Sequence, residues 1–223
     1  MKVSLAAILG LLESLFGGED WNLRGSAEVG TEPHTDDTIK QAAVDWCTGG
    51  DARDAVIGKH GAMKDWDVSA VTNMANLFNG DGDRGGNDIF QTCVLYVEDW
   101  NTSSVTDMSW MFDHASAFNG DLSNFDTSSV TDMSWMFSGA SAFEGKGLTN
   151  WMTYLVRDFR YMFSYTSFDA DISQWDVSDA TNFDRFLCNA DSFNNNLCDD
   201  GSSPSWFSAG YCVDGAPPSD PCA

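Results

Sequence analysis

The sequence predicts an α/β repeat fold, in which about five units of ~25 residues, each a short strand followed by a short helix, stack into a solenoid. A motif with an aromatic first residue recurs in five places, which we number units one to five and which start at Trp66, Trp100, Phe125, Trp151 and Trp175. Apolar residues, including six of the nine methionines, recur at fixed positions in these units. Because one strand and one short helix cannot bury an apolar face alone, neighbouring units must stack.

Each unit is expected to contain two elements. Apolar and polar residues alternate around the aromatic start, as in 121–127, which predicts a short strand. A serine three residues after the aromatic start is suited to cap a following helix, as at Ser69, Ser103, Ser128 and Ser178. The apolar residues that follow recur at the spacing of one helical face, so the stripes of Met, Phe and Trp are predicted to form the core.

The rest of the chain is divided by composition. Residues 1–18 join one lysine to an apolar run, which predicts a secretory signal peptide, with an amphipathic first helix of a cytosolic protein as the alternative. Residues 19–37 are expected to be a polar linker and residues 38–65 a helical N-terminal cap. The repeat solenoid is expected over 66–198, and a cap or tail rich in Cys and Pro over 199–223. No apolar run reaches the ~20 residues that span a bilayer, so the chain is not expected to be transmembrane.

Six cysteines follow the apolar leader, and none has the spacing of a zinc site. They are predicted to form three disulfides, as in proteins of oxidising compartments, and buried free thiols are the alternative. We expect Cys47 to pair with Cys93, and the other four to pair among themselves; those four are Cys188, Cys198, Cys212 and Cys222.

The repeats resemble those of a known family. The segments W-D-V-S-x-V-T-x-M-x-x-L-F and F-N-G-D-L-S-N-F-D-T-S-S-V-T-D-M-S-x-M-F are similar to the repeats of BspA-like leucine-rich-repeat surface proteins. The same repeat occurs in mycoplasma surface lipoproteins and in secreted microalgal proteins, to which this chain is closest in style. The resemblance implies a leucine-rich-repeat solenoid outside the cell that serves in adhesion or partner binding, and it brings no catalytic residues. Unit four departs from the pattern at Met152, Tyr154, Leu155, Arg157 and Arg160.

Composition and motifs narrow the function further. The 223 residues carry a formal net charge of −23, which disfavours nucleic-acid binding, and 43% of them are hydrophobic, which excludes a disordered acidic tail. None of the common catalytic or nucleotide-binding motifs is present, so the chain is not expected to be an enzyme or to hold a cofactor other than calcium.

One loop of unit one suggests calcium binding. Asp81, Asp83, Asn87 and Asp88 offer oxygen ligands around several glycines, as at the start of a calcium loop. The loop lacks the acidic residue that closes an EF-hand, and a solvated surface insertion is the alternative. The sequence therefore makes these four residues a candidate calcium site.

A candidate binding surface lies at the eleventh residue of each unit. Helical phase places this residue opposite the apolar face, so Trp110, Trp135 and Tyr161 are predicted to form an exposed aromatic row. Arg157 and Arg160 would supply positive charge beside that row. Exposed aromatic rows commonly bind a ligand, although these rings could instead lie flat and cover the core.

These observations predict a non-catalytic protein, secreted or on the cell surface, that recognises an extracellular protein or glycan. The alternative is a structural component of an extracellular covering or assembly, in which calcium ions would bridge neighbouring molecules. An exposed aromatic row favours recognition, whereas calcium-dependent self-association would favour the structural role. The oligomeric state is left open.

Overall fold

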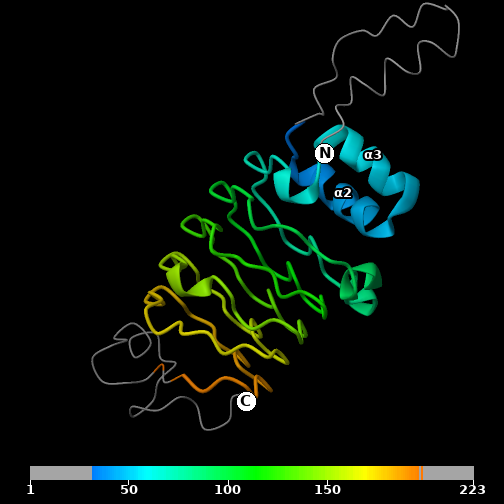
Figure 1. Cartoon of the computed structure of the whole chain (residues 1–223). Helices are drawn as coiled ribbons and strands as arrows, with labels where there is room; N and C mark the ends of the chain where they lie inside the picture. Colours follow the sequence, from blue (N-terminus) through cyan, green and yellow to red (C-terminus); the bar gives the residue numbers. More distant parts are fainter. Residues whose placement is uncertain (1–31, 196, 198–223) are drawn as a thin grey trace, which may run out of the picture.

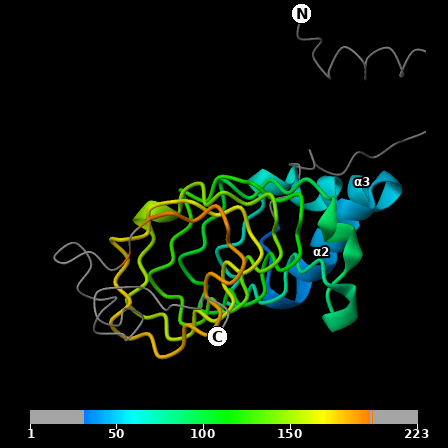
Figure 2. The ribbon, with the colours of Figure 1, turned by 90° about the horizontal axis from the view of Figure 1, so that it is seen from below.

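The computed structural model describes residues 32–195 and 197. Two α-helices lie at one end, and the chain then winds through successive turns toward the other end (Figure 1). After a rotation of 90°, these turns overlap one behind another (Figure 2). The predicted signal peptide over 1–18 and the C-terminal cap or tail over 199–223 lie outside the described residues.

The N-terminal helices are α2, Asp36–Thr48, and α3, Gly50–His60. Helix α2 begins two residues before the segment 38–65 for which a helical cap is predicted, and α3 lies inside that segment. The backbone N–H of Thr35 donates to Thr38 Oγ1 at 2.9 Å. Two aspartates in the first turn of α2 place negative charge at the positive end of the helix dipole, which stabilises the helix. Helix α2 ends at Gly49, whose φ of 75° lies in the left-handed region. Its buried face consists of Ile39, Ala42, Ala43 and Trp46.

The other helical elements are single turns of 3-10 helix. They are η1 (Met63–Asp65), η2 (Gly82–Arg84), η3 (Asp88–Gln91) and η4 (Leu148–Asn150). Unit one spans 34 residues, whereas the next three units span 25, 26 and 24. The extra length of unit one, which we call its insertion, contains η2 and η3, and η4 immediately precedes unit four.

The predicted fold class is wrong, because the part of the chain that the structure describes contains no strand or sheet, and its α-helices lie only before the repeats. The units meet through isolated parallel bridges, each of one residue pair: Asn73–Asp107, Asp107–Asp132, Asp132–Asp158 and Asp158–Asn182. Side chains interrupt the backbone pairing beside each bridge. At unit three, for example, Asp132 Oδ1 accepts a hydrogen bond from the Ser134 backbone N–H at 2.8 Å. Residues 132–134, where a helix was expected, therefore form a bridge and the start of a turn. The strand expected over 121–127 is absent as well, because irregular backbone and a turn occupy these residues.

The predicted helices of the units are absent for a related reason. The eleventh residue of every unit has a positive φ, between 54° and 61°, at Asn76, Trp110, Trp135, Tyr161 and Arg185. A left-handed residue cannot belong to a right-handed helix. Nor do the unit serines cap helices, since in unit three Asp126 Oδ1 accepts from the Ser128 N–H at 2.9 Å and forms a turn.

Backbone hydrogen bonds nevertheless join each unit to the next in register. The Thr106 N–H donates to Thr72 O at 2.9 Å, and the Thr131 N–H donates to Thr106 O at 2.8 Å. In the opposite direction, the Phe112 N–H donates to Met136 O at 2.8 Å. These bonds satisfy backbone groups that the short bridges alone would leave unpaired.

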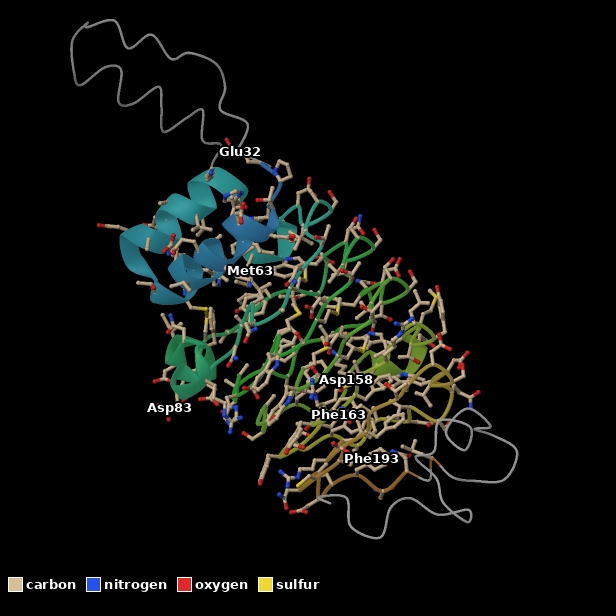
Figure 3. All side chains as sticks on the ribbon, turned by 180° about the vertical axis from the view of Figure 1, so that it is seen from behind. Glu32, Met63, Asp83, Asp158, Phe163 and Phe193 are labelled. Atoms are coloured by element: carbon tan, nitrogen blue, oxygen red, sulfur yellow. A yellow bond between two sulfur atoms is a disulfide. The ribbon has the colours of Figure 1, made fainter. Side chains whose placement is uncertain are left out.

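The predicted core is confirmed. The methionines that recur in the units are fully buried, at Met74, Met108, Met111, Met133, Met136 and Met162. Equivalent phenylalanines of successive units stack, with ring centroids 5.5 Å apart between Phe112 and Phe137 and 5.7 Å apart between Phe137 and Phe163. Phe163 lies inside the stack of units (Figure 3).

A disulfide joins Cys47 of α2 to Cys93, which follows η3, with 5.6 Å between the two Cα atoms. This is the pairing expected from the sequence, and it ties the helical segment to the insertion of unit one. Cys188 is also disulfide-bonded. Cys198, Cys212 and Cys222 lie outside the described residues.

Candidate functional site

The aromatic row of the sequence analysis is a stack of rings, which we call the aromatic stack. Ring centroids are 4.4 Å apart between Trp110 and Trp135 and 3.8 Å apart between Trp135 and Tyr161, and the paired rings are nearly parallel. Left-handed turns of successive units, rather than helices, bring the three rings together. All three side chains are half-buried.

Cations lie against this stack. The Arg185 guanidinium carbon is 5.3 Å from the Tyr161 ring centroid, and Arg185 also donates a hydrogen bond to the Tyr161 hydroxyl. The Arg84 guanidinium carbon lies 5.3 Å from the Trp135 centroid. Because the rings cover one another's faces, the stack offers mainly ring edges to a partner.

A second group of side chains, which we call the unit-four patch, is more exposed. It consists of Met152, Tyr154, Leu155, Arg157 and Arg160. The three apolar members are 52%, 42% and 39% exposed, in that order, and both arginines are exposed. Arg160 Nε lies 3.1 Å from Asp158 Oδ2, whereas no such ion pair holds Arg157 within the described residues. Sequence reasoning placed only the two arginines in a site, although the change from small polar to large apolar residues was a signal for the other three.

A row of acidic groups runs through the bridge positions of the units. Asp107, Asp132 and Asp158 are half-buried, and the row ends in the side-chain amides of Asn73 and Asn182. These amides donate to Asp107 Oδ2 at 3.3 Å and to Asp158 Oδ2 at 3.4 Å. Burial raises the pKa of Asp158, and the neighbouring Asp132 carboxylate adds to that shift. The amides of Asn73 and Asn182 thus donate hydrogen bonds to the end carboxylates of the row, and no further carboxylate of the described residues adjoins Asp107 or Asp158 at those ends.

Three of the four candidate calcium residues accept hydrogen bonds from backbone N–H groups of their own loop. The Asp81 carboxylate accepts from the Asp83 N–H at 3.2 Å, Asn87 from the Ile89 N–H at 3.1 Å, and Asp88 from the Gly82 N–H at 3.1 Å. Asp83 lies on the protruding loop (Figure 3). Of the described acids in this loop, only Asp81 joins a group of three potential metal ligands, and its companions come from unit two. The oxygens of this loop therefore serve mainly to shape its turns.

Two histidines occupy the junction between the helices and unit one. His34 is fully buried, and its ring stacks on His60 with 3.9 Å between centroids. The Trp66 ring lies tilted against it, with 4.6 Å between centroids. Neither ring nitrogen of His34 has a hydrogen-bond partner. Burial, together with repulsion from His60 and Lys59, lowers the pKa of His34 to about 4, although Asp67 opposes the shift.

We expect His34 to make stability depend on pH. The imidazole is neutral in the folded protein but takes up a proton near pH 6.5 when the chain unfolds, so its contribution is complete above that pH and is lost as the pH falls toward 4. The loss is at most about 3 kcal/mol. Urea titrations of wild type and His34→Phe at about pH 7 and pH 4.5 should show a smaller pH dependence in the variant. Equal pH dependence in the two proteins would contradict this assignment.

No helix in the described ranges is long and apolar enough to cross a membrane.

A family described as "Mycoplasma protein of unknown function, DUF285" matches residues 54–84 and 87–200, which is more than half of the chain. No curated protein matches, and no solved structure matches. The matched residues include all five units, the aromatic stack and the unit-four patch.

Proposed function

Because the chain belongs to DUF285, a mycoplasma-type family of repeat proteins of unknown function, we propose that it is a non-catalytic recognition or adhesion protein that acts outside the cell and binds a partner protein through the unit-four patch. The observation that carries the proposal is the exposure of three large apolar side chains within four residues, beside two arginines. Aromatic residues, Met and Arg are enriched where proteins bind one another.

The charge of the patch suggests the kind of partner. The whole chain carries a formal net charge of −23, so two exposed arginines beside apolar groups form a local exception. A partner segment with both apolar and acidic side chains would complement them. Without these arginines, the negative charge of the chain would repel an acidic partner segment.

The aromatic stack favours a protein over a glycan. A sugar ring binds an aromatic side chain by lying on its face. The two faces of the Trp135 ring are covered by Trp110 and Tyr161, and the Tyr161 ring also carries Arg185. Arg160 of the unit-four patch is next in the chain to Tyr161 of the aromatic stack, so the stack borders the patch. We propose that the stack contributes ring edges to the binding surface and makes its border rigid.

An extracellular location is supported by the disulfide between Cys47 and Cys93, since such bonds persist in oxidising compartments. A cell-surface or secreted location is also compatible with the family. The predicted signal peptide agrees with this proposal and remains a prediction.

The binding test replaces the five residues of the unit-four patch by the residues that unit three has at the corresponding positions. A variant with Met152→Asp, Tyr154→Ser, Leu155→Ser, Arg157→Thr and Arg160→Ser carries at each position the side chain that unit three has there. We expect it to fold and to lose affinity by about 30-fold or more for acidic, apolar peptides selected on wild type from a phage-displayed random library. Binding is measured by biolayer interferometry, and folding by circular dichroism and thermal melting.

The control variant, Asp176→Asn with Thr181→Ser, changes two corresponding positions of unit five and should bind as wild type does. Undiminished binding by the unit-four variant would contradict the proposal. A glycan array that labels both proteins alike, with no peptide selected, would favour glycan recognition by another surface. Calcium-dependent self-association that the exchange does not affect would favour the structural alternative.

A further inference from the structure

Three potential metal ligands from two units meet beside the aromatic stack. Asp81 belongs to the insertion of unit one, and Asp113 and His114 belong to unit two. Their ligand atoms all lie within 4.8 Å of one another. His114 Nδ1 is 3.0 Å from Asp113 Oδ1 and 3.9 Å from Asp81 Oδ2.

Asp113 is the unusual member of this group. Its side chain is fully buried, and neither carboxylate oxygen has a hydrogen-bond partner. Although His114 Nδ1 is close, it too makes no hydrogen bond. An ionised carboxylate buried without hydrogen bonds is strongly unfavourable unless another charge compensates it. The corresponding residues of units one, three and four are the uncharged Asn79, Ser138 and Ser164.

The backbone is shaped to bring these groups together. The Gly80 N–H donates to Asp113 O at 2.7 Å, and a Cβ atom on Gly80 would lie only 2.5 Å from His114 O. In unit three, a Cβ on Gly139 would lie 2.9 Å from the ring atom Cδ2 of His114. Both glycines therefore permit a closer approach than other residues would. His114 itself has a φ of 55°, in the left-handed region.

We propose that Asp81, Asp113 and His114 bind a divalent transition-metal ion of the Zn²⁺ class. Ligands about 2.1 Å from such an ion are separated by about 3.0 to 3.5 Å in octahedral or tetrahedral sites. The 3.0 Å between His114 and Asp113 already fits, whereas the Asp81 oxygen, 3.9 Å from His114 Nδ1 and within 4.8 Å of both partners, must move inward. One imidazole nitrogen and two carboxylates suit Zn²⁺ or Mn²⁺, and water completes the coordination. Calcium, which takes six to eight oxygen ligands, is a poor match.

Arg84 holds Asp81 in position for this role. Arg84 Nε lies 3.2 Å from Asp81 Oδ2, and its guanidinium also packs near Trp135. The metal shares the Asp81 carboxylate with this arginine, as groups that orient a metal ligand commonly do. The ion connects the insertion of unit one to unit two, so binding stabilises the folded state.

The test measures Zn²⁺ binding to untagged protein by isothermal titration calorimetry and by thermal melting. It is run at about pH 8, because protons compete with the metal for an imidazole ligand. We expect one Zn²⁺ per chain and a higher melting temperature, with no shift from calcium at the same concentration. Asp113→Asn and His114→Asn should each weaken Zn²⁺ binding by about 100-fold or more. Asparagine tolerates the backbone conformation of His114.

The matched control is Asp83→Asn, which neutralises an acid of the same loop outside the group and should leave Zn²⁺ affinity within about threefold of wild type. Without metal, Asp113→Asn should melt no lower than wild type, because it removes a buried charge. If Asp113→Asn does not fold, the Zn²⁺ affinity of His114→Asn serves as the test instead. Absence of Zn²⁺ binding by wild type, or equal loss in Asp83→Asn, would overturn the proposal. A lower melting temperature of metal-free Asp113→Asn, with no Zn²⁺ effect on wild type, would show a structural ion pair.

Discussion

Met133→Asp is expected to unfold the stacked units cooperatively. Met133 lies in unit three with no exposed surface, and its backbone N–H donates to Asp158 O of unit four at 3.1 Å. The new carboxylate would lie among apolar side chains without a partner, which costs several kcal/mol, and the methionine contacts would be lost as well. Since domains of this size are stable by about 5–15 kcal/mol, most of the stability disappears. Near-UV circular dichroism and urea unfolding at neutral pH measure the loss.

Met152→Asp is the matched control for that prediction. The substitution is the same, but Met152 is 52% exposed and occupies the position where unit three has Asp126. We expect its unfolding midpoint to change little, because surface substitutions usually alter stability by less than about 0.5 kcal/mol. Similar destabilisation by the two variants would contradict the register and the core described above.

The contrast between these two methionines shows what the sequence could predict. Apolar side chains that recur at one position of every unit can all be buried only if the units stack in register, so the core follows from the repeat. The disulfide partners Cys47 and Cys93 also followed, because the other four cysteines are grouped far along the chain.

Secondary structure within the units could not be predicted in the same way. The apolar spacing after Ser128 predicted a helix that includes Asp132, but Asp132 instead forms a bridge to the neighbouring units, and its side chain accepts the Ser134 N–H. The left-handed conformation of Trp135 then prevents a helix. A tryptophan does not predict this conformation, because φ values above zero are uncommon for tryptophan. The ring stack thus arose from a backbone turn that helical phase does not describe.

The group of Asp81, Asp113 and His114 was missed for a different reason. Its members lie in different units, and each stands at a position where other units have different residues. Only the stacking of unit one against unit two brings them together. A useful signal would have been the single charged residue, Asp113, in a column that is otherwise Asn, Ser or Cys.

Removing the disulfide is expected to be the second large effect. A bond between residues 46 positions apart lowers the entropy of the unfolded chain, which corresponds to about 4 kcal/mol by the loop-length relation. The double variant Cys47→Ala with Cys93→Ala should therefore lose up to that amount of unfolding free energy in urea. Single variants would leave a free thiol, so the pair is changed together.

The loss should begin at the helical end of the molecule. Helix α2 packs Trp46 edge-on against Trp66 of unit one, with centroids 6.0 Å apart, and Trp66 stacks on Trp100 at 6.0 Å. Without the disulfide, α2 can separate from unit one and expose Trp66 before the later units unfold. Hydrogen exchange of the double variant should therefore show lower protection in 36–60 than around Met133. Reduction of wild type with dithiothreitol, which also opens the disulfide of Cys188, should lower protection in 36–60 as well. Unchanged stability and protection in both cases would mean that packing of the helices alone holds this end of the fold.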